Sequence, residues 1–225
     1  MDLPNALPVL NAIEIRVLGS LIEKSKTTPD YYPMTLNALT LACNQKTSRK
    51  PVVQYDEETV VIALNSLRKA GFTSTATGGT SRSVKYKHNF TLVFPLTTAE
   101  VAVMCLLFLR GPQTAGELHT NSARLYEFES LEEVLLVLDK LAHADLPLVQ
   151  QLPKRAGQKE VRFTHLLGET IDSSASLTTS FEEEELPEEP ARKSVNELEA
   201  RLALVENEVA IMKVSLEKLM KELMG

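Results

Sequence analysis

Residues 60–72 read VVIALNSLRKAGF, and residues 134–146 read VLLVLDKLAHADL. The two stretches share a pattern of apolar positions. Each follows acidic residues and leads into a short segment of alternating apolar residues. A repeat at this distance indicates two copies of one small unit, so the chain is expected to contain a tandem duplication.

Each copy is predicted to contain three helices. Capping boxes, in which an N-cap side chain and a Glu three residues later satisfy each other's backbone amides, are present at Asn11/Glu14, Thr97/Glu100, Thr114/Glu117, Ser130/Glu133 and Ser194/Glu197. Four of these boxes, with the apolar spacing that follows them, predict helices over residues 12–24, 98–110, 114–121 and 131–144. Apolar spacing also predicts helices over residues 35–44 and 57–70, the latter capped by Asp56.

A hairpin is predicted after the third helix of each copy. The apolar period changes from helical to two over residues 72–76 and 84–90 in the first copy, and over residues 148–152 and 160–165 in the second. Three helices followed by a hairpin is the winged-helix plan. The predicted fold is therefore mainly α with small β-hairpins, consisting of two tandem winged-helix domains at residues 9–95 and 96–168 with separate cores.

The C-terminal residues differ in character from the repeats. Residues 169–193 are predicted to form an acidic flexible linker, because this segment is rich in Glu, Ser, Thr and Pro and has little apolar surface to bury. Residues 194–224 predict a coiled-coil helix, because apolar residues recur at alternating spacings of three and four. These seam residues are Val195, Leu198, Leu202, Val205, Val209, Met212, Leu216, Leu219 and Leu223. We expect the seam to pair between copies and form a homo-oligomer; folding back onto its own chain is the alternative.

The net charge of −6 conceals a basic first copy. Residues 1–95 carry eleven Lys and Arg against seven Asp and Glu, whereas residues 169–191 carry eight acids and no bases. Six cations are candidate contacts to the phosphates of double-stranded DNA: Lys46, Arg49 and Lys50 between the second and third helices, and Arg82, Lys85 and Lys87 on the hairpin. The alternative is a basic loop that only faces solvent.

The start of each third helix argues against ordinary reading of the DNA major groove. Residues 56–58 are Asp-Glu-Glu, and Glu129, Glu132 and Glu133 flank the start of the second copy's helix. These acids complement the helix dipole but repel phosphate. Such helices suit a structural role or contact with a protein.

The sequence contains no pattern typical of an enzyme. The histidines and cysteines lack metal-ligand spacing, and neither a glycine-rich phosphate loop nor a nucleophile motif is present. We therefore expect no catalytic residue, no metal and no cofactor. The longest apolar run, residues 101–109, is too short to span a bilayer, and the N-terminus does not resemble a secretory signal. A cytoplasmic protein without membrane contact is expected.

Several motifs resemble the YceH family of uncharacterised bacterial proteins. In the first half they lie at residues 31–37, 42–46, 49, 51–53 and 55–57, and in the second half at residues 109–114, 116–118, 157, 160, 162 and 165–168. The resemblance covers about residues 9–168. It implies a tandem winged-helix fold with an unassigned function, and it brings no catalytic residues.

Two functions are consistent with these observations; the first is the leading interpretation and the second is the alternative. The first is a non-enzymatic DNA-binding or regulatory protein that uses the basic loop and hairpin of the first copy. The second is a protein–protein adaptor, similar in plan to chromosome-segregation adaptors built from tandem winged helices. A contiguous arrangement of the six cations favours the first function, and a scattered arrangement favours the second.

Overall fold

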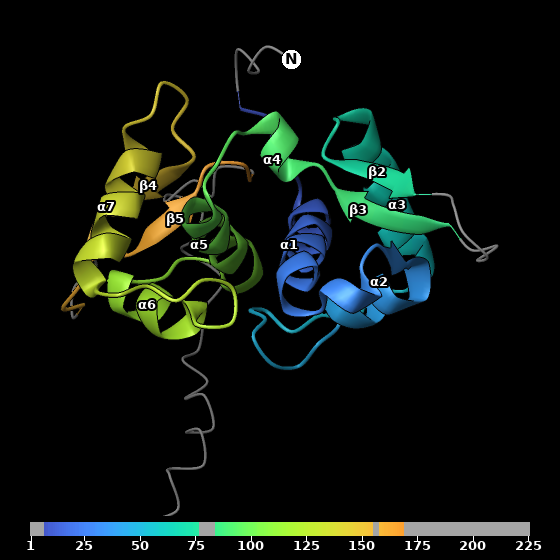
Figure 1. The fold of residues 1–225 in the computed structure, drawn as a ribbon, viewed down its shortest axis with the longest axis horizontal. Coiled ribbons are helices and arrows are strands. Elements are labelled where there is room, and N and C mark those ends of the chain that lie inside the picture. Colours follow the sequence, from blue (N-terminus) through green and yellow to red (C-terminus); the bar gives the residue numbers. More distant parts are fainter. Residues whose placement is uncertain (1–6, 77–83, 155–157, 169–225) are drawn as a thin grey trace, which may run out of the picture. The chain divides into compact units, whose positions relative to one another are not determined.

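The computed structural model describes residues 7–76, 84–154 and 158–168. Its first half contains α1 (Ala12–Thr27), a short 3-10 helix (Pro29–Tyr31), β1 (Met34–Thr35), α2 (Leu36–Cys43), α3 (Glu57–Lys69), β2 (Thr73–Ala76) and β3 (Lys85–His88). The short helix α4 (Phe90–Val93) leads into the second half. There follow α5 (Thr98–Arg110), α6 (Ala115–Ser122), α7 (Leu131–Ala142), β4 (Val149–Gln151) and β5 (Phe163–His165). The order of three helices and a hairpin therefore occurs twice (Figure 1).

The capping residues set the helix starts as predicted. Complete capping boxes are present at Asn11, Thr97 and Thr114. At Ser130 only half of the box forms: the Ser130 side chain caps the Glu133 amide. The Glu133 carboxylate accepts instead from the Glu129 amide at 2.8 Å and from the Tyr126 hydroxyl at 2.9 Å. The fifth predicted box, Ser194/Glu197, lies outside the described residues.

Each hairpin gains a third segment that sequence periodicity did not reveal. In the first half β3 lies between β2 and β1 in an antiparallel sheet, with Met34 opposite Tyr86. In the second half β4 pairs with β5, and Gln113, just before α6, forms an isolated bridge with Phe163 of β5. Both extra segments are too short for a period of two to be recognised. They fix the start of the second helix of each half against its hairpin.

The predicted strand over residues 84–90 is shorter in the structure. It ends at His88, and the chain turns into α4 at Phe90. This turn allows Phe90 to pack against Phe72, Phe94 and Phe108, with ring centroids 6.4, 5.4 and 5.6 Å apart, respectively. Burial of three neighbouring aromatic rings outweighs two more residues of strand pairing.

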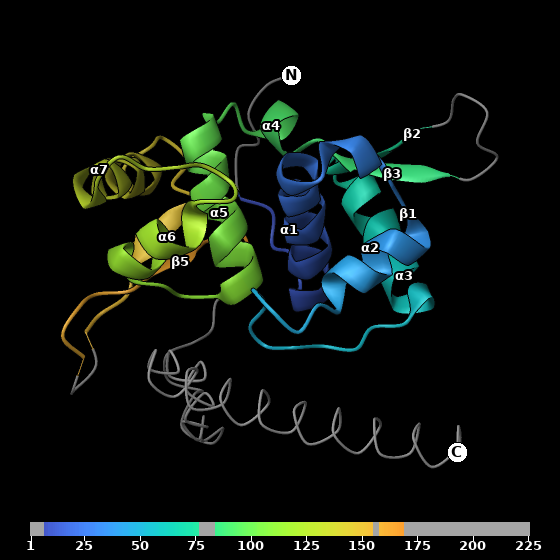
Figure 2. The ribbon, with the colours of Figure 1, turned by 60° about the horizontal axis from the view of Figure 1, so that its bottom comes forward.

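The centre of residues 7–168 is the packing of α1 against α5, which lie side by side in Figures 1 and 2. Residues 14–22 of α1 and 99–109 of α5 are buried on all sides. Gly19 makes the close approach possible: a Cβ atom there would lie 3.0 Å from Phe108 Cβ and from Leu109 Cδ2. A helix that is buried all round belongs to the interior rather than to the surface of a separate module.

The expectation of two separately cored modules is therefore wrong for the described residues. Buried side chains of both halves form one continuous cluster. The aromatic contacts run from Phe72 through Phe90 to Phe108, and on to His165 of β5 at 4.9 Å. The boundaries at residues 9–95 and 96–168 stay predictions of where each repeated unit begins and ends. They do not delimit separate cores.

The fold class is confirmed as mainly helical with small antiparallel sheets. The predicted linker at residues 169–193 and coiled coil at residues 194–224 lie outside the described part of the chain. Among the described helices, none combines the length and the apolar character that crossing a bilayer requires.

Candidate functional site

The loop that joins α2 to α3 carries Lys46, Arg49 and Lys50, three of the six predicted DNA contacts. Arg49 is buried, and its side chain has no exposed surface. Its Nη2 donates to Glu23 Oε2 of α1 at 2.6 Å and to the Ala42 carbonyl at 3.0 Å. Arg49 is thus placed in the interior, and its assignment as a DNA contact is corrected.

The ion pair explains why two charges lie inside the first half. Burial of the Glu23 carboxyl opposes its ionisation, but the hydrogen bonds and charges of Arg49 and, to a smaller extent, Lys24 together outweigh burial and hold the pKa of Glu23 below its ordinary value. Arg49 also donates to Gln45 Oε1 at 3.0 Å. Its donors are therefore used within the fold, as a buried guanidinium requires.

The same loop is bound to the neighbouring half. The Lys50 amide donates to the Leu109 carbonyl of α5 at 2.9 Å. Arg110 Nη2 donates to Ser48 Oγ at 3.0 Å. Arg16 of α1 donates to the Pro51 carbonyl at 2.7 Å. The loop therefore braces the packing of α1 on α5.

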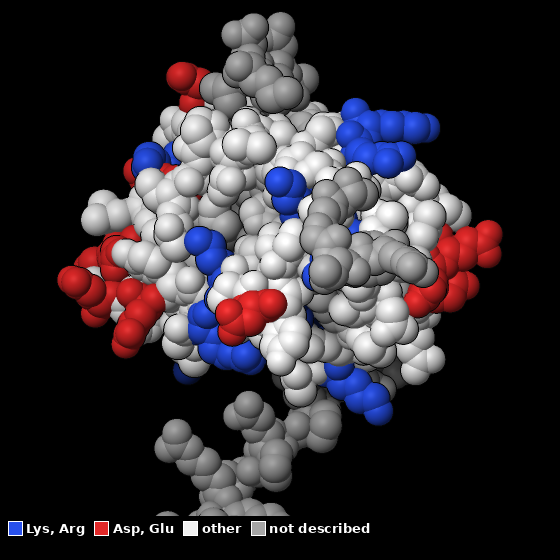
Figure 3. All heavy atoms as spheres, turned by 45° about the vertical axis from the view of Figure 1, so that its right-hand side comes forward, with Lys and Arg blue, Asp and Glu red and all other residues white. Residues whose placement is uncertain are grey.

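The structure does not gather the described members of the remaining cations at one edge. Lys46, Lys50 and Lys87 are exposed and Lys85 is half-buried, while Arg82 lies outside the described residues. Figures 1 and 2 place β3 and the loop after α2 at different edges of the first half. On the face shown in Figure 3, Lys and Arg side chains lie in separate groups with other residues between them.

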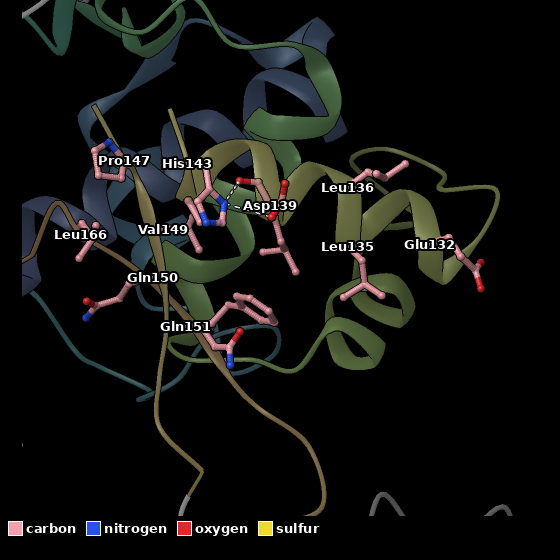
Figure 4. A pocket seen from close by; sticks show the side chains of 13 residues that line it. Glu132, Leu135, Leu136, Asp139, His143, Pro147, Val149, Gln150, Gln151 and Leu166 are labelled. Carbon is pink, nitrogen blue, oxygen red and sulfur yellow. Dashed lines mark hydrogen bonds and ion pairs between the residues drawn. The ribbon is translucent and has the colours of Figure 1, made fainter. Parts of the chain in front are cut away.

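A groove of about 840 Å³ lies in the second half between α7 and the hairpin of β4 and β5 (Figure 4). Its walls are mainly apolar. The residues that line it are Glu132, Leu135, Leu136, Leu138, Asp139, Ala142, His143, Pro147, Val149, Gln150, Gln151, Phe163 and Leu166.

The α7 side of the groove combines exposed leucines with acids. Leu136 is 70% exposed and Leu135 is 44% exposed. Glu132 and Asp139 are the two acidic residues of the lining, and both are exposed. Lys and Arg are not among the described residues that line the groove. The result is an apolar surface with a negative rim.

The groove also contains an Asp–His pair. His143, the C-cap residue of α7, has its Nδ1 3.0 Å from Oδ1 of Asp139, four residues earlier in the chain (Figure 4). Both side chains are largely exposed, and Ser, Thr and Cys are not among the described lining residues. A nucleophile for this pair to activate is therefore not provided by the groove lining.

The repeat places a matching surface on α3. Ile62 occupies the position of Leu136 in the duplicated helix and is 65% exposed. Glu58 occupies the position of Glu132 and is also exposed. In both halves the outer face of the third helix thus presents a large apolar side chain one turn after a Glu.

The leucines of α7 were missed as site residues, although the sequence contained a signal. Val134, Leu138 and Leu141 form the buried stripe of α7. Leu135 and Leu136 add apolar surface beyond that stripe, so the helix has more apolar residues than one buried face needs.

The described residues contain no group of three or more His, Cys, Asp and Glu side chains arranged to hold a metal ion. Cys43 and Cys105 are both free and buried. Burial raises the pKa of each thiol, most strongly for Cys105. Thiols in such surroundings are poor nucleophiles.

Comparison with known proteins places the chain in a family. The sequence profile described as "Protein of unknown function, DUF480" matches residues 10–158. A UPF0502 protein of Opitutus terrae is 51% identical over 171 residues, which are 76% of this chain and 74% of that protein. The UPF0502 protein Shewana3_1622 of Shewanella sp. strain ANA-3 is 45% identical over 93% of this chain and 97% of its own length. A UPF0502 protein of Solibacter usitatus is 44% identical over 93% and 95%, respectively. These matches confirm the resemblance found in the sequence motifs, and the chain belongs to the DUF480/UPF0502 family of uncharacterised bacterial proteins, consistent with the YceH type.

Proposed function

We propose that this protein is a non-enzymatic protein–protein adaptor built from two winged-helix units. The repeated order of three helices and a hairpin supports the winged-helix assignment. Fold alone does not decide function, so the choice of adaptor rests on the outer faces of α3 and α7.

The observation that carries the proposal is the apolar and acidic character of the third helices. In a DNA-binding helix-turn-helix protein the corresponding helix contacts base edges between phosphates. Here that position has Ile62 after Glu58 in one half and Leu136 after Glu132 in the other. Exposed Leu and Ile gain free energy by leaving water for another apolar surface, and carboxylates repel phosphate. Both properties favour a protein partner over DNA.

The scattered cations support the same choice. Arg49 is paired with Glu23, and the loop around it is bound to α5. A surface that binds DNA through phosphates needs several unpaired cations that follow the duplex. The loop after α2, which carries Lys46 and Lys50, and strand β3, which carries Lys85 and Lys87, lie at different edges of the first half (Figures 1 and 2).

The experiment is affinity capture of partners from a nuclease-treated extract of a bacterium that carries the protein. The bait is the full chain as wild type, as Leu136→Glu and, as a matched control, as Leu92→Glu. Leu92 lies on α4 and is 71% exposed, so the control adds the same charge at the same exposure outside the groove. We expect partners that survive nuclease, are lost with Leu136→Glu and are kept with Leu92→Glu.

DNA binding remains the second candidate because Lys46, Lys50 and Lys87 are exposed. Its test is titration of labelled duplex with wild type and with Lys46→Ala/Lys50→Ala at several salt concentrations. Affinity that falls steeply with salt and weakens in the double variant would favour this candidate over the adaptor.

We also propose that the heptad residues 195–223 pair between copies of the chain. We further propose that the protein is cytoplasmic and does not contact a membrane. The support for pairing is the unbroken apolar spacing of the sequence. The mass in solution distinguishes pairing between copies from folding of the heptad residues back onto their own chain. The full chain should be a multimer and a chain ending at Gly168 a monomer, whereas two monomers would contradict pairing.

A further inference from the structure

We infer that the groove between α7 and the β4–β5 hairpin binds an amphipathic helix whose leucine-type face is flanked by Lys or Arg. The groove would then be the site through which the second half holds its protein partner. The choice of a protein as ligand rests on the proposed function, whereas the shape and charge of the groove are independent of it.

The shape of the groove suits a helix. α7 contains twelve residues, which at ~1.5 Å per residue give a wall of about 18 Å. A helix laid along such a wall presents about three turns, enough for anchors at positions i, i+3 or i+4, and i+7. The opposite wall is supplied by Val149, Phe163 and Leu166 from the hairpin (Figure 4).

Two large apolar side chains of the groove, Leu135 and Leu136, stay exposed in the described structure, whereas Leu138, Val149 and Phe163 are buried and form its floor. Leu136 and Leu135 belong to α7 but face away from its buried stripe of Val134, Leu138 and Leu141. Large apolar side chains gathered around a concave surface mark an interaction site rather than chance exposure. Leucine-type anchors fill such a groove without leaving buried polar groups unpaired.

The charges at the rim of the groove determine which charged residues the ligand should carry beside its apolar face. Glu132 and Asp139 are the two carboxylates of the rim; Asp139 pairs with His143, and the described lining contains no Lys or Arg. Glu132 and Asp139 are seven residues apart on one face of α7, at the two ends of the exposed leucines. Cationic residues at the ends of the ligand's apolar face gain attraction there, whereas acidic residues are repelled. The same carboxylates disfavour the phosphates of a nucleic acid.

The test uses synthetic helical peptides and the full chain. One peptide carries leucines at i, i+4, i+7 and i+11 with Lys flanks, the second replaces Lys by Glu, and the third replaces the leucines by Ser. Fluorescence anisotropy of the labelled peptides gives Kd at several salt concentrations. We expect the Lys-flanked peptide to bind at least ten-fold more tightly than either of the others, with an affinity that falls as salt rises.

Variants locate the binding. Leu136→Glu should weaken the Lys-flanked peptide at least ten-fold, and Leu92→Glu should leave it unchanged. Glu132→Lys should reduce the preference for Lys flanks and improve binding of the Glu-flanked peptide, a rescue that a merely unfolded variant cannot produce. Circular dichroism checks that each variant keeps the helical content of wild type.

Several outcomes would overturn the inference. These are equal binding of the Lys- and Glu-flanked peptides, insensitivity to Leu136→Glu, or no binding by the full chain, as expected if other residues already fill the groove. The result is separable from that of the proposed function. Partners captured regardless of Leu136→Glu would keep the adaptor and reject the groove. Peptide binding by the full chain without any captured cellular partner would keep the groove as a binding site and reject the adaptor.

Discussion

The guanidinium of Arg49 lies between Glu23 of α1 and the last carbonyl groups of α2. A buried ion pair adds modestly to stability when intact, but loss of one partner leaves the other charge buried and unpaired. Two cations of the same loop can therefore have different roles: Arg49 stabilises the interior, whereas Lys46 is exposed to solvent.

Replacement of Arg49 by Ala should lower the free energy of unfolding by about 3 kcal/mol, because the hydrogen bonds to Ala42 and Gln45 are lost and the Glu23 carboxylate keeps only Lys24, at 3.4 Å. Lys46→Ala should change it by less than about 0.5 kcal/mol, since the residue is at the surface. Urea unfolding followed by circular dichroism measures both. If Arg49→Ala proved as stable as Lys46→Ala and lost affinity for duplex DNA, Arg49 would be a nucleic-acid contact after all.

His88 and His165 make stability depend on pH. Burial lowers the pKa of His165 to about 4; burial, with a smaller effect from Lys26, lowers that of His88 to about 4. The unfolded chain takes up protons on these imidazoles below about pH 6.5, whereas the folded chain does not until about pH 4. Stability is therefore fully present above pH 6.5 and is lost as pH falls toward 4.

Each of these histidines should contribute on the order of 2 to 3 kcal/mol to that loss. His165→Gln should remove about half of the dependence between pH 6.5 and pH 4. Unfolding free energies from urea titrations at pH 7, 5.5 and 4 give the slopes of wild type and variant. An unchanged slope in His165→Gln would show that His165 is not held neutral in the folded protein.

At the scale of elements, the crossing of α1 and α5 is controlled by Gly19. Glycine lowers the stability of an isolated helix, so its place in the middle of α1 needs a compensating contact. The contact is the backbone-proximal Cβ of Phe108, which cannot rotate away, together with the side chain of Leu109.

Gly19→Ala should cost roughly 1 kcal/mol or more, because overpacking at the crossing exceeds the gain of about 1 kcal/mol in helix propensity. Gly116 of α6 is the matched control: a Cβ there would meet only Thr114 Oγ1, at 3.9 Å. Gly116→Ala should therefore be neutral or slightly stabilising. Thermal unfolding compares the two. A Gly19→Ala variant more stable than wild type would mean that α5 shifts to accept the methyl group.

At the scale of the whole molecule, the common core couples the two halves. The cluster of buried residues runs through α1, α4 and α5, and Lys50 and Ser48 add polar bonds between the loop of one half and the end of α5. Elements that share buried contacts unfold together when neither has a complete core of its own.

Residues 7–168 should therefore unfold in one cooperative transition. The chain has no Trp, so Tyr55→Trp and Tyr126→Trp place one fluorescent probe in each half. Leu39→Ala in α2, far from the second half in sequence, should lower stability by about 2–5 kcal/mol. We expect it to shift the urea midpoint at both probes equally. If the urea midpoint reported by the probe at residue 126 did not change, the two halves would be independent folding units.

The sequence by itself determined the six main helices and the two hairpins of the described residues. Capping residues act over three positions and apolar periods over one or two turns, so helix starts at Asn11, Thr97 and Thr114 and the duplicated order of helices and hairpin follow from local interactions. Family membership was also recognisable, because motifs are carried by residue identity along the chain.

Only the tertiary structure decided which charges are free and how the halves join. Whether a cation pairs with Glu23 or faces solvent depends on residues 26 positions away, as for Arg49, and no local pattern encodes that contact. The pairing of the short strand β1 with β3 and the packing of α1 on α5 likewise arise between segments distant in sequence. The groove beside α7 depends on how the β4–β5 hairpin packs against that helix. Periodicity shows that a helix has an apolar face, but the partner of that face is chosen by three-dimensional packing.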